Sequence, residues 1–350
     1  MKNKIYLIFF SFFISFLFIE IIIRIFIPQD ISEPWRVYLD DGLLLNKNNG
    51  VAKHSFKKAN RTTEYSFGKY HNRKYNLTIS EDKILFLGDS FTFGWLLQDE
   101  DTYVYKLGEK FSKYELINSA AGGNGTADQL RYFEKFCNKI KPRYTFILIN
   151  AYDIERSKIS NLYSLDKENN LINGKNNIPK ISYFVDNNYL YKFLISNFHT
   201  VNFLRKIYVS INNILSNKKP LIGDKVNNKS NKFFEVDKIE NLSNKKYILE
   251  KKLFKRFKDF SLECGTDIHL INLAWENREK NLTDTDKFLK DSSEFFKQIN
   301  INYIDLYDKM KAKHKNQKTY QIEVDGHPNE KANNLYFENL HDVLKKIIKK

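Results

Sequence analysis

Three residues in this chain of 350 have the types and the setting that nucleophilic catalysis requires. Ser90 stands in the string Gly-Asp-Ser-Phe-Thr-Phe-Gly-Trp directly after the apolar run 83–87, where a strand would turn into a helix. Near the other end of the chain, Asp325 and His327 stand two residues apart in Asp-Gly-His-Pro-Asn. An imidazole can take the proton of a serine hydroxyl when a carboxylate orients its ring. These residues therefore indicate acyl-transfer chemistry through a covalent serine intermediate.

The same residues also have a structural interpretation. Asp89 or Ser90 could serve only as the N-cap of a helix, and Pro328 beside His327 is typical of the first helical position. Glu323 is a second, less favoured candidate for the orienting carboxylate. The sequence alone leaves these alternatives open.

A glycine-rich segment follows the second apolar run and reads Asn-Ser-Ala-Ala-Gly-Gly-Asn-Gly-Thr over 118–126. Its glycines permit positive φ angles and let backbone N–H groups face a ligand, although such segments often only connect elements. No Gly-Lys-Ser or Gly-Lys-Thr follows, which excludes a P-loop.

Short apolar runs alternate with amphipathic segments from residue 83 onward, and this alternation must position the candidate residues. The expected strands are 83–87, 115–118, 144–149, 268–273 and 303–306. The expected helices are 101–112, 127–140, 237–263, 284–298 and a last one after Pro328. The pattern predicts an α/β fold, a three-layer α/β/α sandwich around a mainly parallel five-stranded sheet, with the candidate residues at the carboxyl ends of strands.

These motifs resemble, in order, the blocks of the SGNH (GDSL-type) hydrolases, in particular a membrane-anchored bacterial branch. The resemblance implies a flavodoxin-like fold, Ser90 as nucleophile, His327 as general base and Asp325 as the residue that orients it. It also implies that the N–H groups of Ser90 and Gly123 form an oxyanion hole. The resemblance covers about 83–155 and 265–345.

The third block departs from the family pattern. The family has Asn-Asp after the third strand, whereas this chain has Asn150-Ala151-Tyr152-Asp153. Alignment on Asp153 puts Tyr152 where the oxyanion-hole Asn belongs, and Asn150 is then a candidate third donor only if the turn is shifted. Loss of one such donor costs about 10²–10³ in rate.

The amino terminus predicts a membrane segment over residues 5–27. Positions 5–19 carry no charge, and Glu20 and Arg24 interrupt the rest of the apolar stretch. Lys2 and Lys4 precede it, so we expect an uncleaved signal anchor in the cytoplasmic membrane, with the N-terminus inside and the remaining chain in the periplasm. A cleaved signal peptide and a buried core helix are the alternatives.

The chain divides into an anchor at 1–28, a linker and N-terminal extension at 29–82, and a hydrolase domain at 83–350. An insertion at about 155–235 interrupts the last part and contains an apolar helical stretch at 188–215. The insertion is either a lid or wall of a substrate site, or a helical hairpin that only packs on the sheet. Cys137 and Cys264 can form one disulfide at most, and the sequence does not say whether they do.

The charge of the chain is strongly positive but scattered. Its 57 Lys and Arg outnumber its 42 Asp and Glu, giving +15, yet no nucleic-acid-binding motif accompanies them, so no nucleic-acid partner is expected. We expect a serine esterase or deacylase that acts on an acylated cell-envelope glycan or a small ester and needs no cofactor or metal. The alternatives are an O-acyltransferase with the same site and a non-catalytic glycan-binding protein. The oligomeric state is not predicted.

Overall fold

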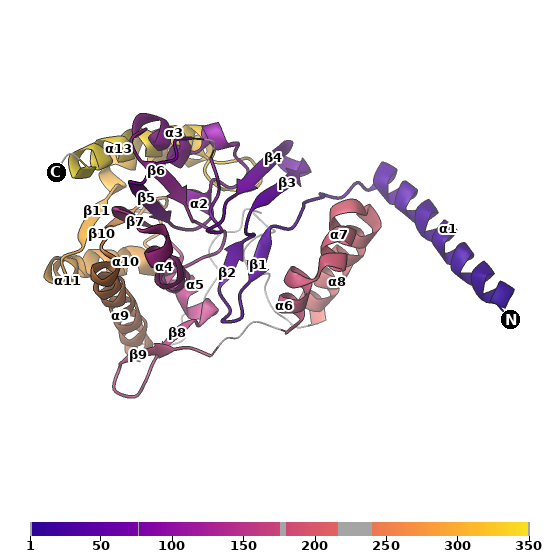
Figure 1. The fold of residues 1–350 in the computed structure, drawn as a ribbon, viewed down its shortest axis with the longest axis horizontal. Coiled ribbons are helices and arrows are strands. Elements are labelled where there is room, and N and C mark those ends of the chain that lie inside the picture. Colours follow the sequence, from indigo (N-terminus) through magenta and orange to yellow (C-terminus); the bar gives the residue numbers. More distant parts are fainter. Residues whose placement is uncertain (1, 76, 176–179, 216–239, 349–350) are drawn as a thin grey trace.

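Five apolar runs form one parallel sheet in the computed structural model, which describes residues 2–75, 77–175, 180–215 and 240–348 (Figure 1). The order of the strands is β11-β10-β7-β5-β6. Their bounds are β5 (Lys83–Leu87), β6 (Glu115–Asn118), β7 (Tyr144–Ile149), β10 (Asp267–Asn272) and β11 (Asn302–Asp305). The predicted α/β class and sheet are confirmed, and β10 and β11 begin one residue earlier than expected.

The strands are apolar throughout because helices cover both faces of the sheet. Leu85 and Leu87 of β5 belong to the core under one helical layer, whereas Ile84 and Phe86 belong to the core under the other. Successive side chains of a strand point to opposite faces, so this alternation divides one continuous run between two cores.

Seven helices of the described chain form the two layers (Figure 1). One layer contains α4 (Thr126–Ile140), α5 (Asp153–Ser160), α9 (Glu240–Cys264), α10 (Asp284–Asp291) and α11 (Ser293–Gln298). The other contains α3 (Tyr103–Lys110) and α13 (Glu330–Ile348). The prediction of a single helix over 284–298 is wrong, because Ser292 leaves helical geometry and separates α10 from α11. The expected helix start at 237–239 lies outside the described residues.

The strand order reverses beside β5. The chain passes from β5 to β6 on one side and then returns to β7 on the other. Ligands of open α/β sheets bind outside the carboxyl ends of strands at such a reversal. The four-residue helix α2 (Ser90–Phe93) begins at this point, and α12 (Lys311–Lys315) lies later in the chain. Single 3-10 turns occur at Lys57–Ala59, Asp99–Asp101, Tyr307–Met310 and Gln317–Tyr320.

The N-terminal extension forms two antiparallel hairpins. They consist of β1 (Arg36–Tyr38) with β2 (Leu44–Asn46), and β3 (Gly50–Phe56) with β4 (Arg61–Phe67). Tyr65 and Phe67 of β4 pack with Trp35 and with Phe93 of α2 in a separate apolar cluster. The extension therefore contacts the element that carries Ser90.

The insertion contains a small hairpin and three helices. The elements are β8 (Tyr163–Leu165), β9 (Leu171–Asn173), α6 (Lys180–Asn187), α7 (Tyr189–Asn197) and α8 (His199–Leu215). The helix expected over 188–215 is in fact two helices, because Phe198 adopts an extended conformation (φ −117°, ψ 122°) between them. The insertion's predicted residues 176–179 and 216–235 lie outside the described chain.

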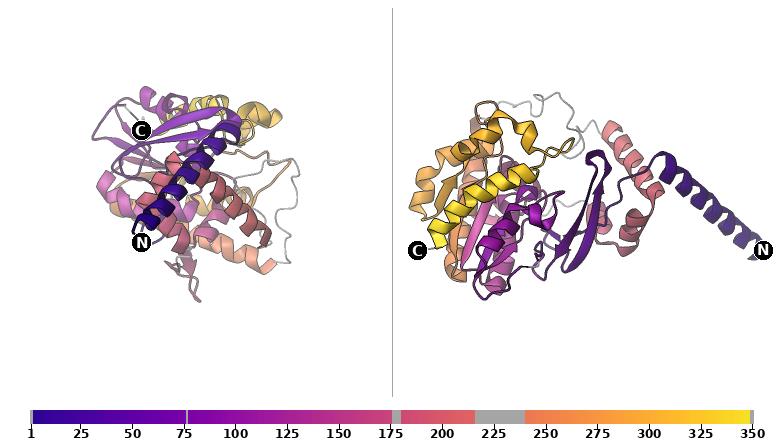
Figure 2. Two further views of the ribbon diagram at one scale, coloured as in Figure 1. Left: turned by 90° about the vertical axis from the view of Figure 1, so that its right-hand side faces the viewer. Right: turned by 90° about the horizontal axis from the view of Figure 1, so that it is seen from above.

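Helix α1 (Lys2–Phe26) projects from the body of the molecule (Figure 2). Its segment Tyr6–Phe26 has the length and composition of a membrane span or of a signal sequence. The structure thus agrees with the predicted apolar helix without choosing between these two roles.

A disulfide joins the two cysteines that the sequence left open. Cys137 of α4 bonds Cys264 at the end of α9, with Cα atoms 6.1 Å apart. The bond connects neighbouring helices of one layer across a sequence separation of 127 residues.

Candidate active site

Ser90, His327 and Asp325 form one hydrogen-bonded chain. The Oγ of Ser90 lies 3.0 Å from Nε2 of His327, and Nδ1 of His327 lies 2.6 Å from Oδ1 of Asp325. A proton on Nδ1 that is donated to Asp325 leaves Nε2 free to accept the serine proton. The structure therefore brings together the three residues that the sequence predicted, although they are far apart in the chain.

The turn from β5 into α2 separates the capping role from the hydroxyl. Asp89 is the N-cap of α2, and its Oδ1 accepts the N–H of Phe91 at 3.0 Å. Its Oδ2 accepts bonds from the side chains of Asn150 and Arg156. Because Asp89 caps the helix, the hydroxyl of Ser90 remains available to His327.

The loop before α13 explains how a spacing of two suffices for Asp325 and His327. Gly326 has a φ of +90°, a conformation that glycine adopts without strain, so the chain folds back on itself. As a result, Oδ1 of Asp325 accepts both the ring N–H and, at 3.2 Å, the backbone N–H of His327. Glu323 is exposed, so Asp325 is the carboxylate that contacts the imidazole.

The glycine-rich loop lies against Ser90. A Cβ added to Gly122 would meet Cβ of Ser90 at 3.9 Å, and a Cβ added to the left-handed Gly123 would meet nothing within 4 Å. Within the described chain, the N–H groups of Ser90 and Gly123 donate no hydrogen bond. Two N–H groups without partners beside a nucleophile have the chemistry of an oxyanion hole.

Asn150, predicted as a possible third donor, has a different role in the structure. Its Nδ2 donates to Asp89, and its Oδ1 accepts the N–H of Tyr152 at 3.1 Å. The turn after β7 is therefore not shifted in the way that this prediction requires, and Asn150 braces the N-cap of α2. Burial, with a smaller contribution from Glu276, raises the pKa of Tyr152 to about 12, so its phenol keeps its proton.

Trp95 is a site residue that sequence reasoning missed. Its Nε1 donates to Oδ2 of Asp325 at 3.4 Å, and its ring lies 5.7 Å from that of His327. The only sequence signal was its place five residues after Ser90 in the first motif. Trp275, which the sequence treated in the same way, is buried, and its ring packs against Phe91 at 5.1 Å.

Two arginines of the N-terminal extension hold the loops beside the site. Arg73 is fully buried and donates to the carbonyls of Phe93, Gly94 and Leu97 at 2.7–2.8 Å. Arg61 forms a two-pronged ion pair with Glu330, the first residue of α13, at 2.7 and 3.0 Å. Neither residue was predicted, because nothing in their local sequence indicates such distant partners.

Asp325 remains ionised despite its burial. Burial alone would raise its pKa, but hydrogen bonds from His327 and Trp95 outweigh this effect and lower the pKa. An ionised carboxylate stabilises the imidazolium that forms when His327 takes a proton. Among the described residues, no group of three His, Cys, Asp or Glu side chains is arranged to hold a metal ion.

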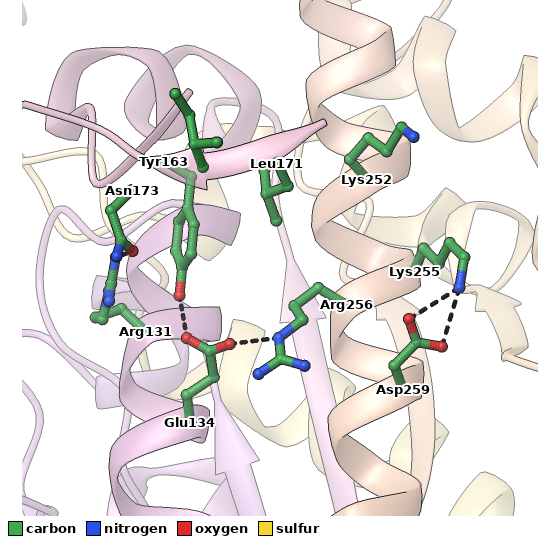
Figure 3. A pocket seen from close by; sticks show the side chains of 10 residues that line it. Arg131, Glu134, Tyr163, Leu171, Asn173, Lys252, Lys255, Arg256 and Asp259 are labelled. Carbon is green, nitrogen blue, oxygen red and sulfur yellow. Dashed lines mark hydrogen bonds and ion pairs between the residues drawn. The ribbon is translucent and has the colours of Figure 1, made fainter. Parts of the chain in front are cut away.

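A cavity of about 780 Å³ lies elsewhere, between α4, the β8–β9 hairpin and α9 (Figure 3). Its charged side chains are largely paired with one another: Arg256 contacts Glu134 at 2.6 Å, and Lys255 contacts Asp259 at 2.8 Å. None of the residues Ser90, His327 and Asp325 lines it, so this cavity is separate from the candidate active site.

No family model and no curated protein matches the sequence. Solved structures do match, and three of them illustrate the range. The psychrotrophic esterase EstA from Pseudoalteromonas sp. is 14% identical, with 77% of this chain and 100% of that chain covered and a TM-score of 0.42. The acetyl xylan esterase AlAXEase is 14% identical (75% and 98% covered, TM-score 0.41). A protein from Desulfitobacterium hafniense DCB-2, described as lipolytic and of the G-D-S-L family, is 14% identical (75% and 98% covered, TM-score 0.38). Similarity at this level establishes no activity, so the function must be argued from the site.

Proposed function

We propose that this chain is a serine ester hydrolase of the SGNH (GDSL) type. The observation that carries the proposal is the hydrogen-bonded chain from Ser90 through His327 to Asp325. Its setting supports the same conclusion, since the nucleophile stands at the strand-order reversal beside two N–H groups without partners. A non-catalytic binding protein would not need this arrangement.

The reaction follows from the positions of these groups. Oγ of Ser90 attacks the acyl carbonyl carbon while Nε2 of His327 takes its proton, and the N–H groups of Ser90 and Gly123 bind the oxyanion. The carbon–oxygen bond to the leaving alcohol then breaks, and the imidazolium returns the proton to that alcohol. Water attacks acyl-Ser90, gives its proton to His327, and the carboxylic acid leaves as Ser90 regains its hydrogen.

The proposed location is the outer face of the cytoplasmic membrane, with α1 as the anchor. Lys2 and Lys4 precede the apolar helix and favour an N-terminus inside. The disulfide between Cys137 and Cys264 supports an oxidising compartment for the body, because such bonds are rare in the cytosol. At this location, acylated cell-envelope glycans are the proposed substrates.

The test compares the full chain in detergent with Ser90→Ala and His327→Ala, using nitrophenyl acetate. We expect each variant to lose at least about 10³-fold in rate and no fluorophosphonate to label Ser90→Ala. The control His341→Ala, which changes a histidine on the surface of α13, should keep the wild-type rate. Equal rates in wild type, Ser90→Ala and His327→Ala would contradict the proposal.

A second measurement separates hydrolysis from acyl transfer. The same acyl-Ser90 could be resolved by a sugar hydroxyl instead of water, so an oligosaccharide acceptor is added to the assay. Acetate release with no acetylated sugar supports the hydrolase, and acetylated sugar that requires Ser90 would identify a transferase.

A further inference from the structure

The corner between α7 and α8 packs on the middle of the apolar helix α1. The ring of Phe198 meets the ring of Phe16 edge-on, with centroids 5.3 Å apart. Phe16 is the midpoint of the candidate span Tyr6–Phe26, about 15 Å from its outer end at about 1.5 Å per residue. If α1 crosses a bilayer, the corner lies at the depth of the hydrocarbon core's outer half.

The polar groups of α1 are used to hold this corner. The two carboxylate oxygens of Glu20 accept the backbone N–H groups of His199 and Thr200, at the start of α8, at 2.9 and 2.8 Å. Arg24 contacts Glu20 at 3.1 Å and also donates to the carbonyl of Asn197 at 3.1 Å. A charge and free helix-end amides are both costly in lipid, and here each satisfies the other.

The outer surface of α8 is an apolar stripe that no described part of the chain covers. Leu204, Ile207, Tyr208 and Ile211 follow the spacing i, i+3, i+4, i+7, and their side chains are 39–59% exposed. Such a stripe normally faces a protein core. On α7, exposed Tyr189, Leu190 and Phe193 extend the apolar surface toward α1.

We propose that the α7–α8 corner is a second membrane contact, immersed in the outer leaflet with its stripe against lipid acyl chains. The inference rests on the proposed anchor role of α1. Lipid is the favoured occupant because the stripe is continuous with the exposed apolar surface of α1, which lies beside α7 and α8 in both figures of the whole fold (Figures 1 and 2). Exposed tyrosines and the neighbouring Arg205 and Lys206 are typical of an interface with anionic headgroups.

The corner also connects the anchor to the body. Asn187 at the end of α6 donates to the carbonyl of Tyr38 in β1 at 3.2 Å, and the hydroxyl of Tyr183 donates to Asp40 at 3.0 Å. The hydrolase body is therefore held on the bilayer through a folded joint as well as through the chain after Phe26. The insertion, in this assignment, is neither a lid nor a simple packing hairpin.

The test places nitroxide labels on the full chain in vesicles of phosphatidylcholine and phosphatidylglycerol, with the native disulfide left oxidised. Single cysteines replace Tyr189 or Tyr208 in the corner, Phe12 in α1, and Leu262, which is 70% exposed on α9. Relaxation by oxygen, which concentrates in lipid, is compared with relaxation by a water-soluble nickel chelate. We expect the oxygen-to-nickel ratio at Tyr189→Cys and Tyr208→Cys to resemble that at Phe12→Cys and to exceed that at Leu262→Cys several-fold.

Each other outcome overturns the inference in a distinguishable way. A lipid-like Phe12→Cys with water-like Tyr189→Cys and Tyr208→Cys refutes the membrane contact and leaves the anchor intact. A water-like Phe12→Cys refutes the anchor and the inference together. Label–label broadening at Tyr208→Cys that dilution with unlabelled protein removes would identify a second copy as the occupant. Esterase activity of the same samples is measured separately and depends on none of these results.

Discussion

Two buried carboxylates in this protein have opposite fates. Asp325, at the carboxyl edge of the sheet, accepts hydrogen bonds from His327 and Trp95, and its pKa is lowered. Glu250 lies inside the layer of α4, α5 and α9, and neither of its oxygens has a hydrogen-bond partner in the described chain. Burial raises the pKa of Glu250 to about 8, and the nearby hydroxyls of Thr126 and Ser157 offset this only in part.

The comparison shows that burial does not by itself set the charge of a carboxyl group. N–H donors favour the ionised form of Asp325, whereas Glu250 is kept protonated because nothing stabilises its charge. The first arrangement serves catalysis, and the second makes the stability of the protein depend on pH.

The largest expected effect comes from Asp325→Asn. An amide in place of the carboxylate cannot hold His327 in the tautomer that accepts the serine proton, so kcat should fall by about 10³–10⁴-fold. Steady-state hydrolysis of nitrophenyl acetate measures the change. Glu323→Gln, two residues away and exposed, is the matched control and should retain the wild-type rate. The reverse ranking of the two variants would assign the carboxylate role to Glu323.

A smaller effect, on stability, should come from Glu250→Gln. Between the ordinary pKa of 4.5 and the folded pKa of about 8, the folded state holds a proton that the unfolded state has lost. The stability of the wild type should therefore fall as pH rises through this window, by at most roughly 1.4 kcal/mol per pH unit from this group. Glu250→Gln removes that contribution, so its free energy of unfolding should gain on the wild type from pH 5 to pH 8.

Urea unfolding across this pH range measures the difference. Glu263→Gln, on the exposed surface of the same helix, should follow the wild type at every pH. Parallel pH profiles for Glu250→Gln and wild type would show that Glu250 is ionised in the folded protein.

The smallest effect should come from Trp95→Phe. This change keeps an aromatic ring beside His327 but removes one N–H donor from Asp325. We expect kcat to fall roughly tenfold while KM stays nearly constant. The proton resonance of His327 Nδ1–H should also shift, which a purely structural change would not cause. An unchanged resonance and rate would remove Trp95 from the site.

The elements of the sheet and the three residues of the hydrogen-bonded chain were predictable because their signals are local. Strands β5, β6 and β7 match the expected bounds, since a run of apolar residues buried on both faces has clear limits. Ser90 and His327 stand in short motifs at strand and helix boundaries, where backbone geometry restricts the residue types. The break at Phe198 was not predictable, because the apolar pattern continues through it, and the extended residue allows α8 to begin at Glu20.

By itself, the sequence determined the α/β class, the apolar helix at the amino terminus and the identity of the candidate nucleophile, base and carboxylate. Only the tertiary structure decided that Asn150 supports Asp89, that Trp95 donates to Asp325 and that Cys137 meets Cys264. It also decided which face of the insertion remains uncovered. The physical reason is that periodicity and turn chemistry act over a few neighbouring residues, whereas hydrogen-bond partners and burial depend on segments that only folding brings together.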